Sequence, residues 1–320
     1  MAKPVLLVMS PSDNPYLPML NGASDRFHLK TGVTADELAD QEAEALFAWV
    51  PNRTEIGKLL TRTPRLRWIH SRWAGLDSLL TPALVDHPLV ITNARGVYSQ
   101  SLGEFVIFGA LYFAKDTPRL LAAQAQHKWE PFTMLEIRGA TMGISGYGDI
   151  GRACASRAHS LGMRVLATRR RPELSGSDPY VDRVFPREGL LEMIAECDYV
   201  VSAAPLTPET HKMFGEREFK AMKSSAVFMN VGRGPVVDEA ALARALESKR
   251  IRGAALDVFE TEPLSPESPL WSQPNVLISP HCADNTPTWH EESMQFFLRN
   301  LDHFAKGEPL ENVVDKTAGY

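Results

Sequence analysis

Short runs of apolar residues alternate with helical patterns along almost the whole chain. The runs are continuous rather than alternating, and turn residues bound them, which is typical of strands in a parallel sheet covered on both faces. In the first part of the chain they lie at residues 5–9, 46–50, 67–70 and 89–92. A second series lies at residues 141–145, 164–168, 199–202, 226–229, 253–256 and 276–279.

Helical patterns fill most of the intervals between these strands. They lie at residues 54–62, 101–115, 150–161, 190–197, 216–222, 239–248 and 288–306, and a polar stretch at 116–128 follows the second of them. Alternating strands and helices predict the α/β class with parallel sheets. The second series of strands matches what the two mononucleotide-binding halves of a Rossmann domain need. Because single cores stop growing at about 250–300 residues, a chain of 320 residues predicts two domains.

Charge and cysteine content narrow the class of protein. The chain carries 34 Lys and Arg residues against 39 Asp and Glu residues, a net charge of −5, which argues against nucleic acid or an anionic membrane as the main partner. Three scattered cysteines, Cys154, Cys197 and Cys282, have no metal-ligand spacing and indicate a reducing compartment. We expect no metal site.

No segment predicts membrane insertion or export. The apolar stretch at residues 105–114 is far shorter than the ~20 residues that a spanning helix needs. The first apolar run, residues 5–9, is too short for the apolar core of a signal peptide. We therefore expect a cytoplasmic protein.

A glycine-rich turn joins the strand at 141–145 to the helix that follows. Gly146, Gly148 and Gly151 have the spacing G-x-G-x-x-G, which in this strand–turn–helix context predicts a dinucleotide site. The first glycine permits the turn, the second admits a pyrophosphate, and the third lets the helix approach the strand. Cofactor contacts are expected from every residue of the turn, namely Gly146, Tyr147, Gly148, Asp149, Ile150 and Gly151.

Three consecutive arginines end the next strand, where an NAD-binding domain has an acid for the ribose. Arg169, Arg170 and Arg171 occupy this place, and no acid follows until Glu173. Guanidinium groups can bind a 2′-phosphate through charge-assisted bonds, so we favour NADP(H) over NAD(H). The alternative is a solvated basic strand end.

Polar segments follow three later strands directly, where α/β domains bind ligands. These segments contain Arg233, Glu262 and His281. Each alone has an ordinary explanation, such as a surface charge, a loop acid or a hydrogen-bonded histidine. Their joint occurrence behind a glycine-rich turn indicates a catalytic group instead.

With these motifs, the chain resembles the D-isomer-specific 2-hydroxyacid dehydrogenase family. Within it, the segment 265–271 and the tail ending Gly319-Tyr320 resemble the glyoxylate/hydroxypyruvate reductase A type. The resemblance covers the chain from about residue 46 to the C-terminus. The matching stretches are residues 146–151, 205–210, 230–234, 236–239, 253–258, 262–264 and 280–281.

The resemblance implies a role for each member of the group. Arg233 would bind the substrate carboxylate and polarise the carbonyl, and His281 would be the general acid in reduction. Glu262, paired with His281, would favour the imidazolium. Arg233 and His281 would contact cofactor and substrate alike. Further cofactor contacts are expected by analogy from Pro205, Thr210, Val231, Gly232 and Asp257.

A loop after the third strand resembles the substrate loop of the family. Its expected binding residues are Trp73, Ala74 and Gly75, and the backbone amides of this loop would bind the carboxylate. Trp73 stands where the family has a small residue, so it either narrows the pocket or lines it for an apolar side chain. Trp129 resembles an aromatic residue that reaches the neighbouring subunit in some relatives, which hints at a homodimer.

The resemblance also implies how the domains are arranged. We expect a Rossmann NAD(P)-binding domain at residues 99–287, inserted in a discontinuous, flavodoxin-like substrate-binding domain at residues 1–98 and 288–320. The implied activity is reduction of glyoxylate and hydroxypyruvate to D-2-hydroxy acids, with NADPH favoured. Two alternatives stay open. One is a 3-phosphoglycerate-type or longer-chain dehydrogenase, and the other is a cofactor-sensing, corepressor-like protein on the same fold.

Overall fold

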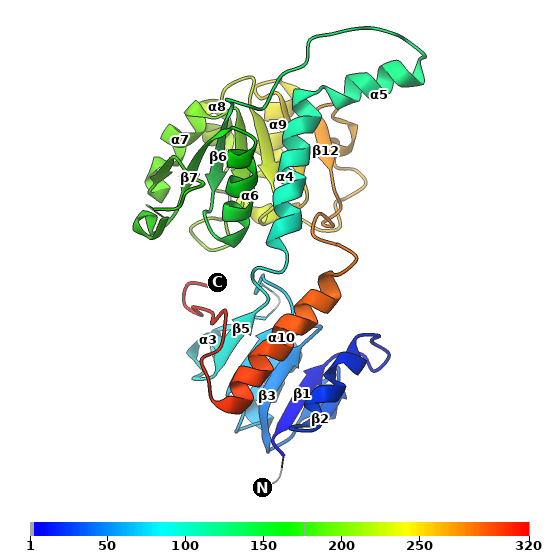
Figure 1. Ribbon diagram of the computed structural model, residues 1–320, viewed down its shortest axis with the longest axis vertical. Coiled ribbons are helices and arrows are strands. Elements are labelled where there is room, and N and C mark those ends of the chain that lie inside the picture. Colours follow the sequence, from blue (N-terminus) through cyan, green and yellow to red (C-terminus); the bar gives the residue numbers. More distant parts are fainter. Residues whose placement is uncertain (1–2, 78, 176, 320) are drawn as a thin grey trace. The chain divides into compact units, whose positions relative to one another are not determined.

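The strands form two parallel sheets, one of five strands and one of seven (Figure 1). The computed structural model describes residues 3–77, 79–175 and 177–319. These residues divide into two compact units, the first made of residues 1–98 and 286–320 and the second of residues 99–285. The α/β class with two parallel sheets, expected from the continuous apolar runs, is confirmed.

The first unit is built on the five-stranded sheet, in the order β2-β1-β3-β4-β5. Its strands are β1 (Val5–Met9), β2 (His28–Gly32), β3 (Ala43–Ala48), β4 (Trp68–Ser71) and β5 (Val90–Asn93). Its helices are α1 (Ala35–Leu38), α2 (Arg53–Arg62), α3 (Pro82–Asp86) and α10 (Trp289–Lys306).

Each face of this sheet has its own core. On one face, Leu38, Ile56 and Leu84 from α1, α2 and α3 pack on the strands. On the other, α10 buries Phe297 and Leu301 against the sheet, and Phe297 stacks on Phe47 with ring centroids 3.9 Å apart. Coverage on both faces explains why these strands are continuously apolar.

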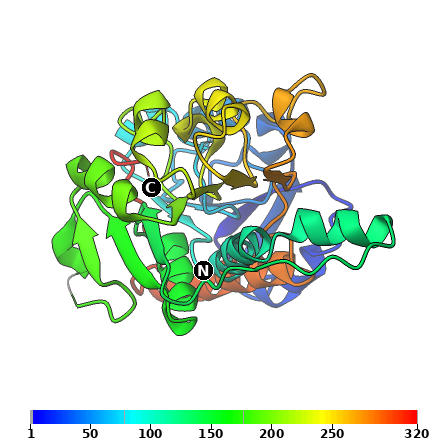
Figure 2. The same ribbon diagram turned by 90° about the horizontal axis from the view of Figure 1, so that it is seen from above.

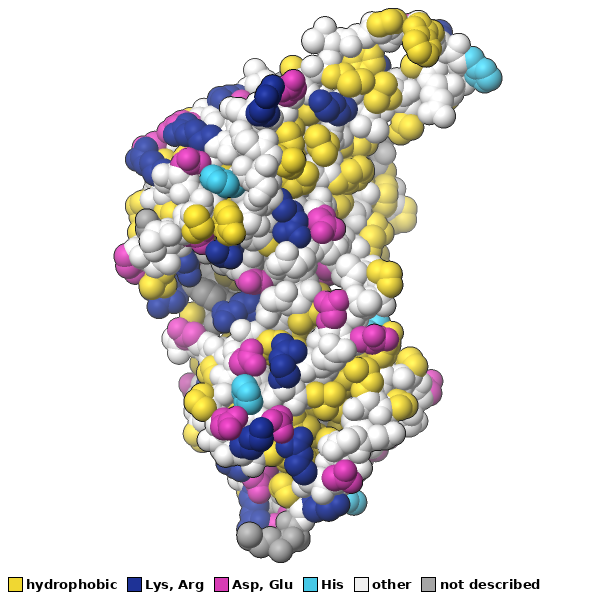
Figure 3. All heavy atoms as spheres, viewed as in Figure 1, with side chains coloured by type: hydrophobic (Ala, Val, Ile, Leu, Met, Phe, Trp, Pro, Cys, Tyr) yellow, Lys and Arg dark blue, Asp and Glu magenta, His cyan; other side chains and the backbone are white. Residues whose placement is uncertain are grey.

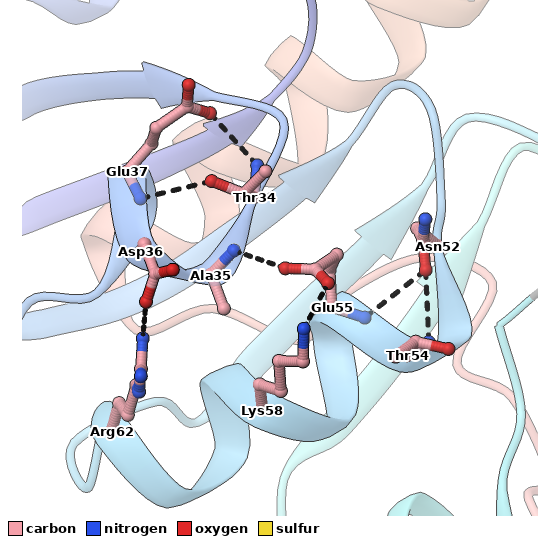
Figure 4. Close-up of polar contacts among 9 residues, drawn as sticks. All are labelled: Thr34, Ala35, Asp36, Glu37, Asn52, Thr54, Glu55, Lys58 and Arg62. Atoms are coloured by element: carbon pink, nitrogen blue, oxygen red, sulfur yellow. Dashed lines mark hydrogen bonds and ion pairs between the residues drawn. The ribbon is translucent and has the colours of Figure 1, made fainter.

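Side-chain caps join α1 to α2 (Figure 4). Thr34 and Glu37 form a capping box at the start of α1, and Glu55 of α2 accepts a bond of 2.7 Å from the Ala35 amide. Asn52 caps α2 by accepting from the amides of Thr54 and Glu55. Helices this short need such caps because their first amides have no partner within the helix.

The second unit is built on the seven-stranded sheet, in the order β12-β11-β10-β9-β6-β7-β8. Its strands are β6 (Thr141–Ser145), β7 (Arg164–Thr168), β8 (Arg183–Phe185), β9 (Tyr199–Ser202), β10 (Val227–Asn230), β11 (Gly253–Leu256) and β12 (Val276–Ile278). The chain runs outward from β6 to β8 and then returns to β9 on the other side of β6. This reversal creates a switch point between β6 and β9, where open α/β sheets bind ligands.

Helices cover both faces of this sheet (Figures 1 and 2). One face carries α4 (Ser99–Ala114) and α6 (Asp149–Ser160), and the other carries α7 (Leu190–Glu196), α8 (Glu216–Ala221) and α9 (Glu239–Glu247). Gly103 lets α4 approach α6, because a Cβ there would lie 3.0 Å from the Ala153 carbonyl oxygen. The α5 helix (Thr117–Ala125) extends away from the rest of the unit.

Several elements differ from the sequence-based expectation, among them the short helices α1 and α3, which were not expected. β2 and β8 were not expected, and both are edge strands with little burial, so neither has the apolar run that marks a central strand. The polar stretch at 116–128 contains α5, which buries no residue. It therefore lacks the buried apolar face that marks the helices that were predicted. Within the described residues no helix is long and apolar enough to cross a membrane, and all three cysteines are free thiols.

A neutral histidine lies in the core of the first unit. His70 is fully buried among Phe47, Phe296 and Phe297, and its Nδ1 lies 2.7 Å from Thr92 Oγ1. Its Nε2 has no partner in the described part of the chain. Burial lowers the pKa of His70 from 6.5 to about 3, so the folded protein holds this ring uncharged at neutral pH.

This depressed pKa predicts acid sensitivity. Between pH 6.5 and about 3 the unfolded chain binds a proton at His70 that the folded chain does not, so stability is full above pH 6.5 and falls as the pH decreases. The loss approaches about 1.4 kcal/mol per pH unit. In urea unfolding at several pH values, His70→Phe should show a shallower loss than the native chain. The exposed-histidine control His28→Gln should keep the native slope, and parallel curves for all three proteins would contradict the assignment.

Candidate active site

The glycine-rich turn lies at the switch point of the second sheet. Gly146 has φ 93°, and a Cβ there would lie 2.6 Å from the backbone of Ala204, which follows β9. A Cβ on Gly151 would lie 2.4 Å from the Gly146 carbonyl oxygen, so only glycine lets α6 start this close to β6. Gly148 has no atom within 4 Å of such a Cβ. Gly146 and Gly151 thus lie against other backbone atoms of the unit, whereas the space beside Gly148 is open.

The other side chains of the turn are buried to different degrees, and Asp149 is exposed. Tyr147 is only 3% exposed, and burial raises the pKa of its hydroxyl. Asp149 begins α6, and its carboxylate accepts a hydrogen bond from Ser99 at the start of α4. Ile150 is half-buried. The backbone of residues 146–151, rather than these side chains, is therefore what the turn offers to a ligand.

The three arginines after β7 differ in their surroundings. Arg169 donates to Ser175 Oγ at 2.5 Å, whereas Arg170 and Arg171 are exposed. A carboxylate lies near this run. Bonds from the Thr207 hydroxyl and the Glu209 amide hold the pKa of Glu209 below its usual value, and the charges of Arg187 and Arg170 add to this effect.

The segment after β9 is stabilised by its own polar groups. Thr210 donates its hydroxyl to the Pro205 carbonyl at 2.6 Å and accepts a bond of 2.8 Å from the Thr207 amide. This hydroxyl shapes the loop at residues 205–210.

Arg233 belongs to a loop held by the last residue of β10. The buried side chain of Asn230 donates to the Arg233 carbonyl at 3.1 Å and accepts from the Gly232 amide at 3.2 Å, while Val231 is buried. Arg233 itself is half-buried, and its Nη1 donates to the Gly232 carbonyl at 2.9 Å.

The next glycine brings this loop against the one that carries Glu262. A Cβ on Gly234 would lie 1.7 Å from the carbonyl oxygen of Phe259, so the two backbones touch. The Phe259 amide in turn donates to Glu262 Oε1 at 3.0 Å. Backbone contact therefore sets how far the Arg233 loop lies from the Glu262 loop.

Glu262 and His281 form a direct pair. His281 Nδ1 lies 2.7 Å from Glu262 Oε2, and both side chains remain partly exposed. A carboxylate at this distance selects the ring form with a proton on Nδ1, which leaves Nε2 as the nitrogen that can exchange a proton with a bound molecule.

Asp257 holds the loop that carries His281. Its carboxylate is 1% exposed, and Oδ1 accepts from Ser279 Oγ at 2.6 Å and from the amides of Cys282 and Ala283 at 3.0 Å each. The Asp257 carbonyl accepts from the His281 amide at 2.9 Å. These bonds stabilise His281 at φ 51°, a left-handed conformation that is uncommon for a residue other than glycine.

A further carboxyl lies near the same charges. Burial raises the pKa of Asp284, and the negative charge of Asp257 adds to this, whereas His281 and Arg233 oppose it. Sequence reasoning did not single out Asp284. Its only sequence signal is a position three residues after His281.

The expected substrate loop lies in the first unit. The Trp73 amide donates to Ser71 Oγ at 3.2 Å, and Asn93 donates to the Ala74 carbonyl at 2.7 Å. The Trp73 ring contacts Trp289 at a centroid distance of 5.2 Å, and Gly75 is half-buried. The structure thus brings Arg233, Glu262 and His281 together in the second unit, while residues 73–75 belong to the first.

Comparison with known proteins decides the family. The model of the NAD binding domain of D-isomer specific 2-hydroxyacid dehydrogenases matches residues 107–283. This chain belongs to the D-isomer specific 2-hydroxyacid dehydrogenase family. It is therefore an oxidoreductase with an NAD(P)-binding domain, and the matched region contains the glycine-rich turn, Arg233, Glu262 and His281.

Proteins similar to this dehydrogenase include a named reductase and solved structures that cover the whole chain. A glyoxylate reductase of Thermococcus gammatolerans is 34% identical over 288 residues, covering 86% of this chain and 84% of the relative. A D-isomer specific 2-hydroxyacid dehydrogenase of Xanthobacter autotrophicus, solved with NADPH and MES, is 31% identical with a TM-score of 0.84 over 100% of both chains. An NADPH-dependent glyoxylate/hydroxypyruvate reductase of Sinorhizobium meliloti, solved with NADP and sulfate, is 28% identical with a TM-score of 0.83 over 100% of both.

Metal binding has no candidate among the described residues of the dehydrogenase. No group of three or more His, Cys, Asp or Glu side chains within residues 3–77, 79–175 and 177–319 is placed to hold an ion.

The contact at Gly234 yields a prediction. In Gly234→Ala the new methyl group must displace the backbone at Phe259, so we expect a loss of about 1–3 kcal/mol in the free energy of unfolding and a displaced Glu262. Urea unfolding measures the first effect, and dehydrogenase activity the second. Gly57→Ala is the matched control, because that glycine lies in α2 with no atom within 4 Å of the added Cβ, and alanine there should be neutral or stabilising. Equal stability of the two variants would contradict this reading of the contact.

Proposed function

We propose that this dehydrogenase reduces small 2-oxo acids, with glyoxylate and hydroxypyruvate as leading substrates, to D-2-hydroxy acids with NADPH. The observation that carries the proposal is the pairing of His281 Nδ1 with Glu262 Oε2 at 2.7 Å, in loops held against the one that carries Arg233. Two relatives support the substrate class, since one is named a glyoxylate reductase and the other a glyoxylate/hydroxypyruvate reductase.

His281 is the proton donor in this proposal. Glu262 orients the ring through Nδ1, so Nε2 is the nitrogen that delivers a proton to the carbonyl oxygen as the alkoxide develops. In the reverse direction Nε2 accepts the proton from the hydroxyl. Asp257 acts as a positioning residue, because it sets the backbone of the His281 loop.

Arg233 is the cation for the substrate. Its guanidinium is always charged and presents a planar fork, which suits a carboxylate and also polarises the adjacent carbonyl. Backbone amides of the loop at residues 73–75 are further donors for that carboxylate. Trp73 either narrows the pocket or lines it for an apolar side chain, and its ring is held by the contact with Trp289.

The glycine-rich turn fits a dinucleotide. The space beside Gly148 is open, and α6 starts with no side-chain cap on its first amides, so these donors are available to a pyrophosphate. When bound, the nicotinamide supplies the hydride. Pro205, Thr210, Val231, Gly232 and Asp257 stay proposed neighbours of this cofactor.

NADPH is favoured by the residues after β7. Arg170 and Arg171 are exposed at the end of the strand, where a 2′-phosphate would lie, and Arg169 is anchored by Ser175 beside them. Two of the structural relatives were solved with NADPH or NADP. A bound 2′-phosphate would compete with the Glu209 carboxylate for the charge of Arg170.

We also infer a homodimer from the arm formed by α5 and the residues after it. Apolar side chains gather over α4 and this arm (Figure 3). Trp129 is 94% exposed, and Leu121, Leu135 and Phe108 are more than half exposed. An apolar surface of this kind is typical of a protein–protein interface, and a second copy of the chain is the partner that we propose.

Loss of the proton donor should separate turnover from cofactor binding. In His281→Ala, kcat for glyoxylate should fall about 10²- to 10⁴-fold, because proton transfer to the carbonyl is lost. The dissociation constant for NADPH, measured by fluorescence titration, should change only a few-fold.

The exposed histidine of α6 provides the control, and His159→Ala should keep native turnover. Native turnover in His281→Ala would refute the assignment. Tight cofactor binding by the native chain without turnover on any 2-oxo acid would favour the corepressor-like alternative instead.

The two exposed arginines should decide cofactor choice. The double variant Arg170→Ser/Arg171→Ser should raise KM for NADPH about 10- to 100-fold, since each charge-assisted bond contributes about 1.5–3 kcal/mol, and leave KM for NADH nearly unchanged. Arg164→Ser is the control, because Arg164 starts the same strand at its opposite end and pairs with Glu196. An equal loss with both cofactors, or a native preference for NADH, would contradict the proposal.

A further inference from the structure

The first unit contains a buried arginine that has no carboxylate partner. Arg72 is 7% exposed, and its guanidinium lies 4.2 Å from the Trp49 ring and 4.1 Å from the Trp73 ring. A third indole, Trp289, lies 5.3 Å away. Among the residues that the structure describes, no Asp or Glu forms an ion pair with Arg72.

Not all N–H groups of the Arg72 guanidinium have a hydrogen-bond partner. Nη1 lies 3.2 Å from His290 Nδ1, which must accept the bond because arginine has no acceptor. Burial, with the charge of Arg72, lowers the pKa of His290, which keeps that ring neutral. Nε is buried and has no hydrogen-bond partner in the described part of the chain. Burial lowers the pKa of Arg72 to about 10, so it is still a cation at neutral pH.

A nearby arginine shows the usual structural solution. Arg67, at the start of β4, lies over the Phe304 ring at 4.6 Å and also pairs with Glu44 at 2.5 Å. Arg72, at the end of the same strand, has the aromatic contacts but not the carboxylate. A buried charge without a counter-charge destabilises the folded protein. The missing carboxylate therefore argues against a purely structural role for Arg72.

The surroundings of Arg72 favour an anion. Trp49 and Arg72 directly follow β3 and β4, at the carboxyl edge where parallel sheets bind ligands. His290 lies in the first turn of α10, whose Thr288 cap makes no side-chain bond to the helix amides. The partial positive charge of that helix end therefore adds to the charge of Arg72.

We propose that Arg72 binds a second oxyanion of the substrate and so extends the substrate class beyond glyoxylate and hydroxypyruvate to 2-oxo acids carrying a distal carboxylate or phosphate, for which it raises kcat/KM. The inference rests on the proposed function, in which the backbone amides of residues 73–75, directly after Arg72 in the same unit, bind the 1-carboxylate. A guanidinium binds carboxylate or phosphate oxygens through its in-plane edge, whereas aromatic rings pack on its faces. The Trp49 and Trp73 rings, at 4.2 and 4.1 Å, limit the motion of this guanidinium.

Matched pairs of substrates test this with the native enzyme alone. Oxaloacetate differs from 2-oxobutyrate by a distal carboxylate in place of a methyl group, and 3-phosphohydroxypyruvate differs from hydroxypyruvate by a phosphate. We expect kcat/KM with NADPH to be at least about 10-fold higher for the anionic member of at least one pair, as a charge-assisted bond predicts. Which pair responds distinguishes carboxylate from phosphate.

Substitution of the arginine assigns the effect. Arg72→Met should reduce that preference about 10- to 100-fold, whereas the control Arg67→Met should retain it. No preference in the native enzyme, or an equal loss for both members of each pair in Arg72→Met, overturns the role of Arg72 while reduction of glyoxylate leaves the proposed function standing. If no 2-oxo acid of the panel is reduced, both proposals fail. Should Arg72→Met not fold, the comparison within the native enzyme still decides.

Discussion

One carboxylate oxygen, Oδ1 of Asp257, organises the loops around His281. Three donors converge on it, and the carbonyl of the same residue binds the His281 amide. A left-handed residue other than glycine costs of order 1–3 kcal/mol, and it persists only where its surroundings hold it. Asp257, buried directly after β11, provides those bonds. The 2.7 Å pairing of His281 with Glu262 depends on this arrangement, because the ring is aimed by the backbone that carries it.

Backbone contacts extend the same order to Arg233. Asn230, at the end of β10, donates a hydrogen bond to the Arg233 carbonyl and so fixes the loop that follows the strand. Gly234 in this loop lies against the Phe259 carbonyl, so backbone contact rather than flexible side chains sets the distance to the Glu262 loop. Proximity fixed by backbone keeps donors and acceptors in place before a substrate binds, which reduces the reorganisation that charge development would otherwise require. The group is thus organised by residues that never need to touch the reacting atoms.

Much of this could be predicted from the sequence, since buried parallel strands have continuous apolar runs and ligand-binding residues follow them directly. β1 and β6 are buried strands with such continuous apolar runs. Arg233, Glu262 and His281 were singled out because the segments that contain them follow apolar strands. Edge strand β2 and the exposed α5 were missed because neither buries an apolar face. The Arg72–His290 contact joins residues 218 positions apart, so no local pattern announces it. Asp257 was expected near the cofactor, but its bonds to the His281 loop depend on how β11 and β12 pair.

Two costly features occupy equivalent places in the two units. The left-handed backbone of His281 lies beyond β12, and the unpaired charge of Arg72 lies beyond β4, each at a carboxyl edge of its sheet. Other parts of the chain pair such groups, as in the capping of α1 and α2 (Figure 4) or the Arg67–Glu44 ion pair. Local rules are typically broken at functional sites, where strain and unpaired charge are useful to a ligand. The net charge of −5 therefore says little about the local chemistry, because Arg72 is buried and Arg233 half-buried in loops after strands, where a cation favours an anionic ligand.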